Sequence, residues 1–211
     1  MQSDEPTIPE SIEEALLRAG FAEGTDGEEL IRLKLRDDEA RLRVLALRAA
    51  ARRKLLANGD WLGALDDSDA EVRRDAVNLI AYEGDIDASI TARIIGLLDD
   101  EDPLVVDGAA FALGEQLCVD AVEQLGDVAQ HHDDARCREA AVAALGVIGD
   151  DRGRAAVLGA LDDKPPVRRR AIVALANFEG PDIDAALEKA SQDRDWQVRA
   201  AAGQLARENA D

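Results

Sequence analysis

The sequence is poor in the residues that usually stabilise a small compact core. Of its 211 residues, six are aromatic and two, Cys118 and Cys137, are cysteines. Two cysteines exclude a disulfide framework, so we expect buried or half-buried thiols. The shortage of large rings argues against a conventional globular core. Ala, Leu, Val and Ile are abundant instead, and these residues suit helices that stack on one another.

Basic residues are also few, with 25 Lys and Arg against 45 Asp and Glu and a formal net charge of -20. Nucleic acids and anionic membranes need clustered positive charge, so the sequence excludes both as partners. The acids are mainly Asp, and only four of the bases are Lys. This composition resembles that of halophilic proteins, in which molar salt shortens the Debye length to about 3 Å. A G+C-rich genome would also favour Arg over Lys.

Long apolar runs are absent. No stretch approaches the roughly 18 apolar residues of a membrane span. The first ten residues, MQSDEPTIPE, have neither the basic start nor the apolar stretch of a signal peptide. We therefore expect a soluble, cytoplasmic protein.

One phrase recurs along the chain, as LDDSDAEVRRDAV from Leu65, LDDEDPLVVDGAA from Leu98 and LDDKPPVRRRAIV from Leu161. We define an anchor as the apolar residue that opens the helix in each copy. The anchors are Leu42, Val72, Val105, Cys137, Val167 and Val198. They follow one another at intervals of 30, 33, 32, 30 and 31 residues, and alanine stands four residues after every one. A fixed period of this length is typical of a solenoid built from one repeated unit.

Each repeat predicts two helices. Asp residues suited to the N-cap position stand three residues before four of the anchors: Asp69, Asp102, Asp134 and Asp195. Pro103 and Pro165 occupy the first helical position, where the missing N–H is harmless. After this first helix, helix A, a break is expected at Gly84, Gly114, Gly149 and Gly180. A second apolar segment, helix B, follows. One hairpin is too small to bury its own apolar face, so stacking forms the core.

Two charged positions also recur. Five residues before the anchors stand Asp37, Asp67, Asp100, His132, Asp162 and Asp193. One residue after the anchors stand Arg43, Arg73, Val106, Arg138, Arg168 and Arg199. Because a guanidinium forks toward carboxylate and carbonyl oxygens, the pattern predicts a ladder of ion pairs that joins each repeat to the next.

The pattern LDD…VR…A…AL, followed by a Gly after helix A, resembles HEAT repeats, in particular the short type found in phycobilin lyases. The resemblance covers about residues 35 to 209. It implies an all-α fold, a right-handed α-solenoid of about six HEAT-like helical hairpins over residues 28–211. Residues 1–27 are then an acidic N-terminal segment with a possible capping helix. The family includes scaffolds, adaptors and a few enzymes.

The sequence HHDD, His131 to Asp134, is the only place where histidines occur. It falls in the turn between two repeats, where His132 takes the acid position of the ladder and Asp134 the N-cap position. We therefore expect a structural turn and no metal. No Ser-His-Asp set, phosphate loop or paired Cys motif is present, so we expect no catalysis and no cofactor. The His-Glu pairs of the di-iron HEAT hydroxylases and the basic, aromatic face of the alkylpurine glycosylases are also missing.

We therefore expect a non-catalytic protein–protein interaction scaffold or adaptor. Helices B would form its inner, concave layer and bind a protein partner or peptide, with the acidic charge favouring basic residues. The candidate contact residues are polar helix B residues outside the ladder: Thr91, Arg93, Glu123, Gln124, Asp127, Arg154, Glu188 and Lys189. Two alternatives stay open: a phycobilin-lyase-like or metal-dependent enzyme of the HEAT class, and a regulatory subunit that braces a partner enzyme.

Overall fold

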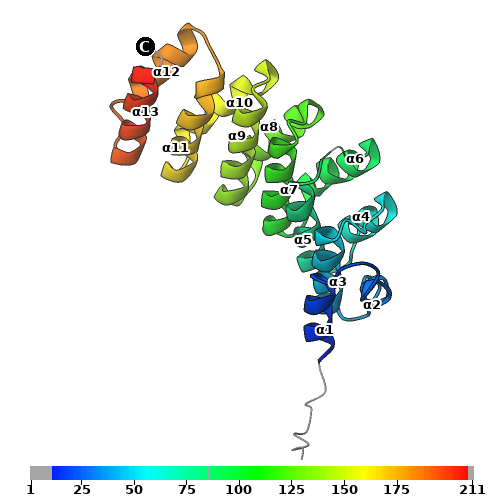
Figure 1. Ribbon diagram of the computed structural model, residues 1–211. Helices are drawn as coiled ribbons and strands as arrows, with labels where there is room; N and C mark the ends of the chain where they lie inside the picture. Colours follow the sequence, from blue (N-terminus) through cyan, green and yellow to red (C-terminus); the bar gives the residue numbers. More distant parts are fainter. Residues whose placement is uncertain (1–10, 85, 209–211) are drawn as a thin grey trace, which may run out of the picture. The chain divides into compact units, whose positions relative to one another are not determined.

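The chain folds into helices joined by short turns (Figure 1). The computed structural model describes residues 11–84 and 86–208, and this part of the chain contains no β-strand. The predicted all-α class is therefore confirmed. Contacts divide the chain into two compact units, unit 1 (Met1–Leu79) and unit 2 (Ile80–Asp211), which are described separately.

In unit 1, helices α1 (Ile12–Ala19) and α2 (Glu28–Lys34) both pack on α3 (Ala40–Arg52). The unit also contains α4 (Asn58–Leu65) and most of α5 (Ala70–Ile80). Ser11 and Glu14 form a capping box at the start of α1. Leu16 of α1 and Ile31 of α2 are buried in one apolar cluster with Ala46 of α3. The predicted boundary between residues 27 and 28 stays a prediction, and the helices on either side of it both pack on α3.

The segment that contains the first anchor, Leu42, forms two separate helices, α3 and α4. Helix α3 ends at Arg52, and Lys54 turns the chain with a positive φ of 56°. Leu55 then donates its N–H to the carbonyl of Ala50 at 2.9 Å, the pattern of a Schellman helix end. The chain therefore reverses without a glycine, and α4 starts at Asn58.

Unit 2 repeats one hairpin four times. Its helices are α6 (Ala88–Gly96), η1 (Leu97–Asp99), α7 (Pro103–Glu115), η2 (Val119–Ala121), α8 (Val122–His131), α9 (Ala135–Ile148), η3 (Asp151–Gly153), α10 (Arg154–Gly159), η4 (Ala160–Asp162), α11 (Pro165–Ala174), η5 (Leu175–Asn177), α12 (Pro181–Ala190) and α13 (Trp196–Glu208). We call the predicted helices A (α7, α9, α11 and α13) row A. The predicted helices B (α6, α8, α10 and α12) are row B. Successive row A helices pack on each other, as expected for a helical solenoid.

The predicted apolar stripe is the core of this stack. The anchors Val105, Cys137 and Val167 are fully buried. The six alanines four residues after the anchors are buried as well: Ala46, Ala76, Ala109, Ala141, Ala171 and Ala202. Small side chains at this position let neighbouring helices approach closely, as the sequence predicted.

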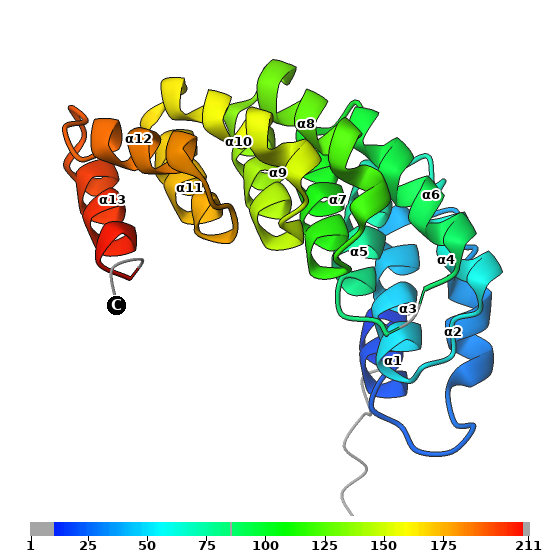
Figure 2. The same cartoon turned by 90° about the horizontal axis from the view of Figure 1, so that it is seen from above.

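The expectation that helices B line the inner side of the curve is wrong for unit 2. Figure 2 shows row A along the inner side of the arc and row B along its outer side. The inner row of an arc must be the more closely spaced, and glycines make this possible. A Cβ on Gly146 of α9 would lie 2.5 Å from the Cβ of Ala174 in α11, and one on Gly114 of α7 would lie 3.1 Å from the Cα of Ala144 in α9.

The predicted helix starts are confirmed. The carboxylates of Asp69, Asp102, Asp134 and Asp195 each accept the backbone N–H two residues later at 2.8 to 2.9 Å. Pro103 and Pro165 open α7 and α11.

The predicted glycine breaks are correct only in part. Gly149 ends α9 in the left-handed conformation, and Gly180 directly precedes α12. Gly114, by contrast, lies inside α7, and Leu117 takes the left-handed position with a φ of 49°. The glycine at 114 therefore serves helix packing and not the turn. None of the described helices is long and apolar enough to cross a membrane.

Candidate binding surface

Arginines of row A hold consecutive hairpins together. Arg138 donates from Nε and Nη2 to the carboxylate of Asp163 at 2.6 and 2.7 Å, and from Nη1 to the carbonyl of His132 at 2.6 Å. Arg168 binds Asp193 in the same way at 2.9 and 2.7 Å. In unit 1, Arg43 binds Asp67 at 2.7 and 2.6 Å. These three rungs confirm the predicted ladder, and their largely buried side chains leave little freedom between hairpins.

One predicted member of the ladder is wrong. Asp163, and not Asp162, accepts the guanidinium of Arg138. Only two residues separate η4 from α11, whereas three separate η1 from α7, so the acid moves one place along the chain. Pro165 also holds Lys164 in an extended conformation and leaves α11 without a side-chain N-cap.

The HHDD turn is built like the other turns. The Nδ1 atom of His132 accepts the backbone N–H of Asp134 at 3.0 Å, just as Asp100 accepts that of Asp102 at 2.9 Å. His131 lies on the exposed end of α8, 4.0 Å from Asp127. Across residues 11–84 and 86–208, no group of three or more His, Cys, Asp or Glu side chains could hold a metal. His132 thus replaces an aspartate as a turn acceptor.

The predicted contact residues all lie on row B, the outer row. Glu123, Gln124, Asp127, Glu188 and Lys189 are exposed on α8 and α12. Thr91 and Arg93 are half-buried on α6, and so is Arg154 on α10. Arg154 is already used within the fold, because its Nη1 binds Asp182 of α12 at 3.1 Å. The eight residues therefore do not line an inner groove, and their role in binding stays a prediction.

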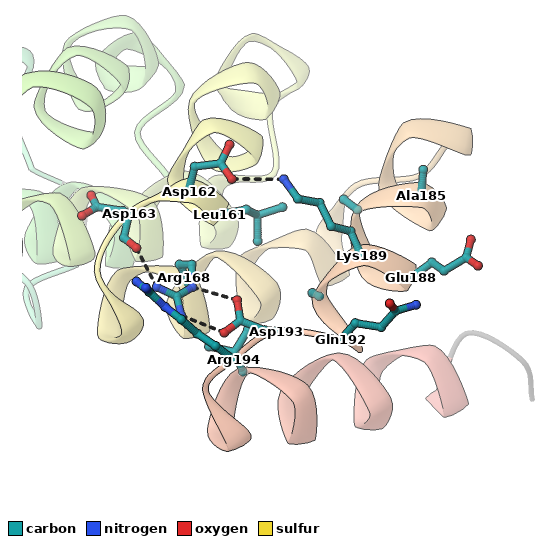
Figure 3. A pocket seen from close by; sticks show the side chains of 13 residues that line it. Leu161, Asp162, Asp163, Arg168, Ala185, Glu188, Lys189, Gln192, Asp193 and Arg194 are labelled. Carbon is teal, nitrogen blue, oxygen red and sulfur yellow. Dashed lines mark hydrogen bonds and ion pairs between the residues drawn. The ribbon is translucent and has the colours of Figure 1, made fainter.

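Two of these residues, Glu188 and Lys189, line a groove of about 720 Å³ between η4 and α12 (Figure 3). Lys189 reaches across its mouth to Asp162 at 3.1 Å, and both side chains are well exposed. The buried pair of Arg168 and Asp193 lies deeper in the same groove. An exposed pair such as Lys189 and Asp162 contributes only about 0 to 1 kcal/mol, so it holds the groove loosely.

A second surface carries the exposed apolar side chains of unit 2. Among the described residues of this unit, every exposed large hydrophobic lies on row A or in the segment between a helix A and the next helix B: Tyr82, Leu104, Phe111, Leu117, Val119, Val147, Val173 and Trp196. The exposure of these apolar side chains was not predicted from the sequence. Its signal is the sixth residue after the anchor, which holds Phe111, Ala143 and Val173 in three successive repeats. We call these three residues the apolar strip.

Polar and aromatic contacts surround the apolar strip. The ring of Tyr82 packs on that of Phe111 with their centroids 6.1 Å apart. Arg170 of α11 lies 3.5 Å from Glu139 of α9. Partial burial raises the pKa of Asp107, one turn before Phe111 on α7. The strip is therefore an apolar band with charges of both signs beside it.

Side chains in the A-to-B loops brace row A from one end. Gln116 donates from Nε2 to the carbonyls of Ile80 and Glu83 at 3.3 and 3.1 Å. Asn177 donates to the carbonyl of Gly146 at 2.7 Å. These bonds could not be predicted from the sequence, because they join neutral side chains to backbone carbonyls and therefore produce no repeating pattern of charged residues in it. Together with the arginine ladder they hold α9 at both ends, through Arg138 near its start and Asn177 near its end.

The two cysteines are a buried and a half-buried thiol. Cys137 is fully buried, and its thiol donates to the carbonyl of Pro103 at 3.2 Å. Burial raises the pKa of Cys137 to about 11, so the thiolate is scarce at neutral pH. Cys118 is half-buried in a loop. Both thiols take the positions that the sequence predicted.

Comparison with known sequences finds one family. The family model for HEAT repeats matches residues 59–146, 90–175 and 122–207. These overlapping matches span most of the chain. No curated protein matches the sequence.

Several solved structures share the fold. An engineered protein is 23% identical, with 85% of this chain and 96% of that chain covered and a TM-score of 0.68. A designed armadillo repeat protein in complex with the peptide (KR)4 is 17% identical over 94% of this chain and 99% of that chain, with a TM-score of 0.56. The complex of CpcE and CpcF of phycocyanin lyase from Nostoc sp. PCC7120 is 19% identical over 95% and 77%, with a TM-score of 0.60. At these identities the likeness shows the repeat fold alone.

Proposed function

The chain belongs to the HEAT-repeat family, and on this basis we propose that it is a non-catalytic scaffold that binds a protein or peptide partner through row A of unit 2. The observation that carries the proposal is the apolar strip. Phe111 on α7 and Val173 on α11 expose 39% and 55% of their surface, and both helices belong to row A. Contiguous exposed apolar side chains on a folded protein mark interaction sites.

The rigidity of row A supports the same function. Arg138, Arg168 and Asn177 tie α9 and α11 to their neighbours, so little ordering of these helices is left to occur on binding. A preformed surface loses less conformational entropy when a partner binds. The apolar strip then supplies the buried contact, and the surrounding charges select the partner.

The chemistry of the partner follows from this surface. Its contact side chains are apolar, to cover Phe111 and Val173, and basic residues flank them, because the whole chain carries a net charge of -20. The similar designed armadillo protein was solved with a peptide of alternating Lys and Arg. That case supports a basic segment as the kind of partner sought here.

Affinity capture tests this function. The wild-type chain, a Phe111→Ser/Val173→Ser variant and a row B control, Ala92→Ser/Ala155→Ser at two exposed alanines, are used as baits in native lysate at the ionic strength of the host. We expect a protein recovered by wild type and control but reduced at least tenfold with the strip variant. Circular dichroism checks that all three baits are folded.

The captured protein is then purified and titrated against the three baits by calorimetry. Equal affinities for all three would contradict the role of the apolar strip. Recovery of no protein, together with turnover of a small molecule, would favour the enzymatic alternative. An obligate complex of fixed stoichiometry with an enzyme would favour the regulatory-subunit alternative.

A further inference from the structure

Two hairpins of unit 2, α8–α9 and α10–α11, each offer the next one a groove and an arginine. The groove between α8 and α9 is filled by the next helix B, since α10 packs on both helices and the preceding turn η3 packs on α8. The fit is tight, because a Cβ on Gly153 would lie 2.8 Å from the Cδ2 atom of Leu145. One turn beyond α10, Asp163 gives its carboxylate to Arg138 of α9. The occupant of such a groove is therefore a helix followed by an acid.

The hairpin α12–α13 offers the same two features. A groove of about 420 Å³ lies between the two helices. It is lined by Leu187 of α12, by Ser191 directly after α12, and by Ala202, Gly203 and Ala206 of α13. Arg199 is held from Nη1 by the carbonyl oxygens of Asp193 and Arg194 at 2.7 and 3.2 Å. Its Nε and Nη2 atoms, the edge that holds a carboxylate in Arg138 and Arg168, bind none among the described residues.

The exposed face of α13 differs from the equivalent face of α9, which packs on the following repeat. At the fifth and eighth positions after the anchor, α13 has Gly203 and Ala206, where α9 has the buried Val142 and Leu145. Two residues before the anchor it has Trp196, which is 67% exposed. This place borders the next helix of the row, because the carbonyl of its counterpart Pro103 accepts the thiol of Cys137. Trp and Arg beside a shallow depression are typical of a binding hot spot.

The acid of the first ladder turn, Asp37 in unit 1, is already paired within the chain. It accepts the ammonium of Lys34 at 2.6 Å and the backbone N–H of Glu39 at 3.0 Å. Lys34 thus supplies the cation that an arginine supplies in the other rungs. A second copy of this chain would have to displace Lys34 before it could offer Asp37 to Arg199.

We propose that the α12–α13 groove and Arg199 form a docking site for an amphipathic helix of a partner protein. That helix carries large aliphatic side chains, which fill the space left by Gly203 and Ala206. It also carries an Asp or Glu about one turn beyond its end, which binds the free edge of Arg199. Trp196 covers the flank of the docked helix. The site lies apart from the apolar strip and does not rest on the function proposed for it.

A peptide copying Pro181–Asp193 of this chain serves as the probe. It has Ile183 and Leu187 on one face, ends with the acid Asp193, and is stapled on its exposed face to keep it helical. The receptor is the full chain with Trp61→Phe, so that Trp196 alone reports by fluorescence. We expect a saturable blue shift, weakened at least tenfold by Arg199→Ala in the chain or by Asp193→Asn in the peptide. Arg136→Ala, which removes an equal charge from an exposed side chain of α9, is expected to change affinity less than twofold.

Three results would overturn the proposal. The first is the absence of a saturable shift up to millimolar peptide whose helicity circular dichroism has verified. The second is equal binding by wild type, Arg199→Ala and the Asn peptide, which would leave no role for the carboxylate. The third is concentration-dependent self-association that Arg199→Ala abolishes, which would assign the site to a second copy. The apolar strip variants are expected to bind the peptide like wild type, so this test and the capture experiment fail independently.

Discussion

Two neighbouring interfaces of row A, α7–α9 and α9–α11, share one backbone plan and differ in chemistry. At α9–α11 the ladder carries Arg138 and Asp163. At α7–α9 the corresponding positions hold Val106 and His132. Both departures from the repeat pattern fall on the same rung, so that rung has lost its cation and its anion together.

This difference shows that apolar packing is enough to hold two neighbouring hairpins together where the ion pair is missing. Val105, Ala109 and Ala141 are fully buried at the neutral rung, as Val167 and Ala171 are at the charged one. An arginine opposite His132 would be a buried cation without a carboxylate, which is strongly destabilising. The turn itself survives, because His132 accepts the N–H of Asp134 in place of an aspartate.

An arginine placed in the neutral rung, between α7 and α9, is expected to have the largest effect on the free energy of unfolding. Val106 is fully buried, so Val106→Arg alone is expected to lower the free energy of unfolding by about 4 kcal/mol. Adding His132→Asp supplies the missing carboxylate and restores most of the loss. Urea titrations of the two single variants and the double variant measure the coupling energy. Additive effects would show that this rung cannot accept the Arg–Asp geometry of its neighbours.

Removing the arginine from the charged rung has the next largest effect. Arg138→Ala leaves the carboxylate of Asp163 and the carbonyl of His132 without their donor, in a largely buried place. We expect a loss of about 3 kcal/mol in the free energy of unfolding at pH 7. Val106→Ala, the matched truncation at the neutral rung, is expected to cost less because it leaves no charge unpaired.

The cost of Arg138→Ala depends on pH. Hydrogen bonds from Arg138 hold the pKa of Asp163 below its ordinary value of 3.8. A lowered pKa in the folded state contributes stability that is complete above the unfolded value of about 3.9 and is lost as the pH falls through the folded value. The difference between wild type and Arg138→Ala should therefore shrink below pH 4. A difference that stays constant down to pH 2 would contradict the ion pair as its cause.

Gly114 and Gly146 compare how tightly the same two interfaces, α7–α9 and α9–α11, are packed. Gly146→Ala would place a Cβ 2.6 Å from the Cα of Ala174, whereas Gly114→Ala would place one 3.1 Å from the Cα of Ala144. Because neither backbone atom can move aside alone, we expect Gly146→Ala to cost about 2 kcal/mol through overpacking. Gly114→Ala should cost clearly less. Thermal unfolding followed by circular dichroism compares the two, and equal costs would mean that α9–α11 is no tighter than α7–α9.

The periodic part of the fold could be predicted from the sequence. Anchors, alanines, N-caps and most rungs of the ladder repeat at a fixed spacing, and every copy confirms the others. Asp162 is the exception among the predicted ladder residues. One residue fewer between η4 and α11 shifts the acid to Asp163, and periodicity alone cannot detect a shift of one place inside an irregular turn.

The candidate site was harder to predict. Polar helix B residues were chosen on the expectation that helices B face inward. The curvature of unit 2 depends instead on how closely its two rows pack, which Gly114 and Gly146 set through contacts with alanines about 30 residues away. The apolar strip was visible in the sequence as Phe111, Ala143 and Val173, but apolar residues in a helical repeat are normally assigned to the core.

The residues that end α7 and α9 also differ, and the smallest change in the free energy of unfolding is expected there. Leu117 and Gly149 stand at the same place, twelve residues after their anchors, and both have left-handed backbones with φ of 49° and 67°. A leucine is strained there and a glycine is not. Leu117 is also 59% exposed, so its side chain contributes little burial. Leu117→Gly should therefore raise the free energy of unfolding by about 1 kcal/mol, and Gly149→Ala should lower it by about 1 kcal/mol. Urea titration measures both. If Leu117→Gly destabilised the protein, contacts of the leucine side chain would have to outweigh the backbone strain.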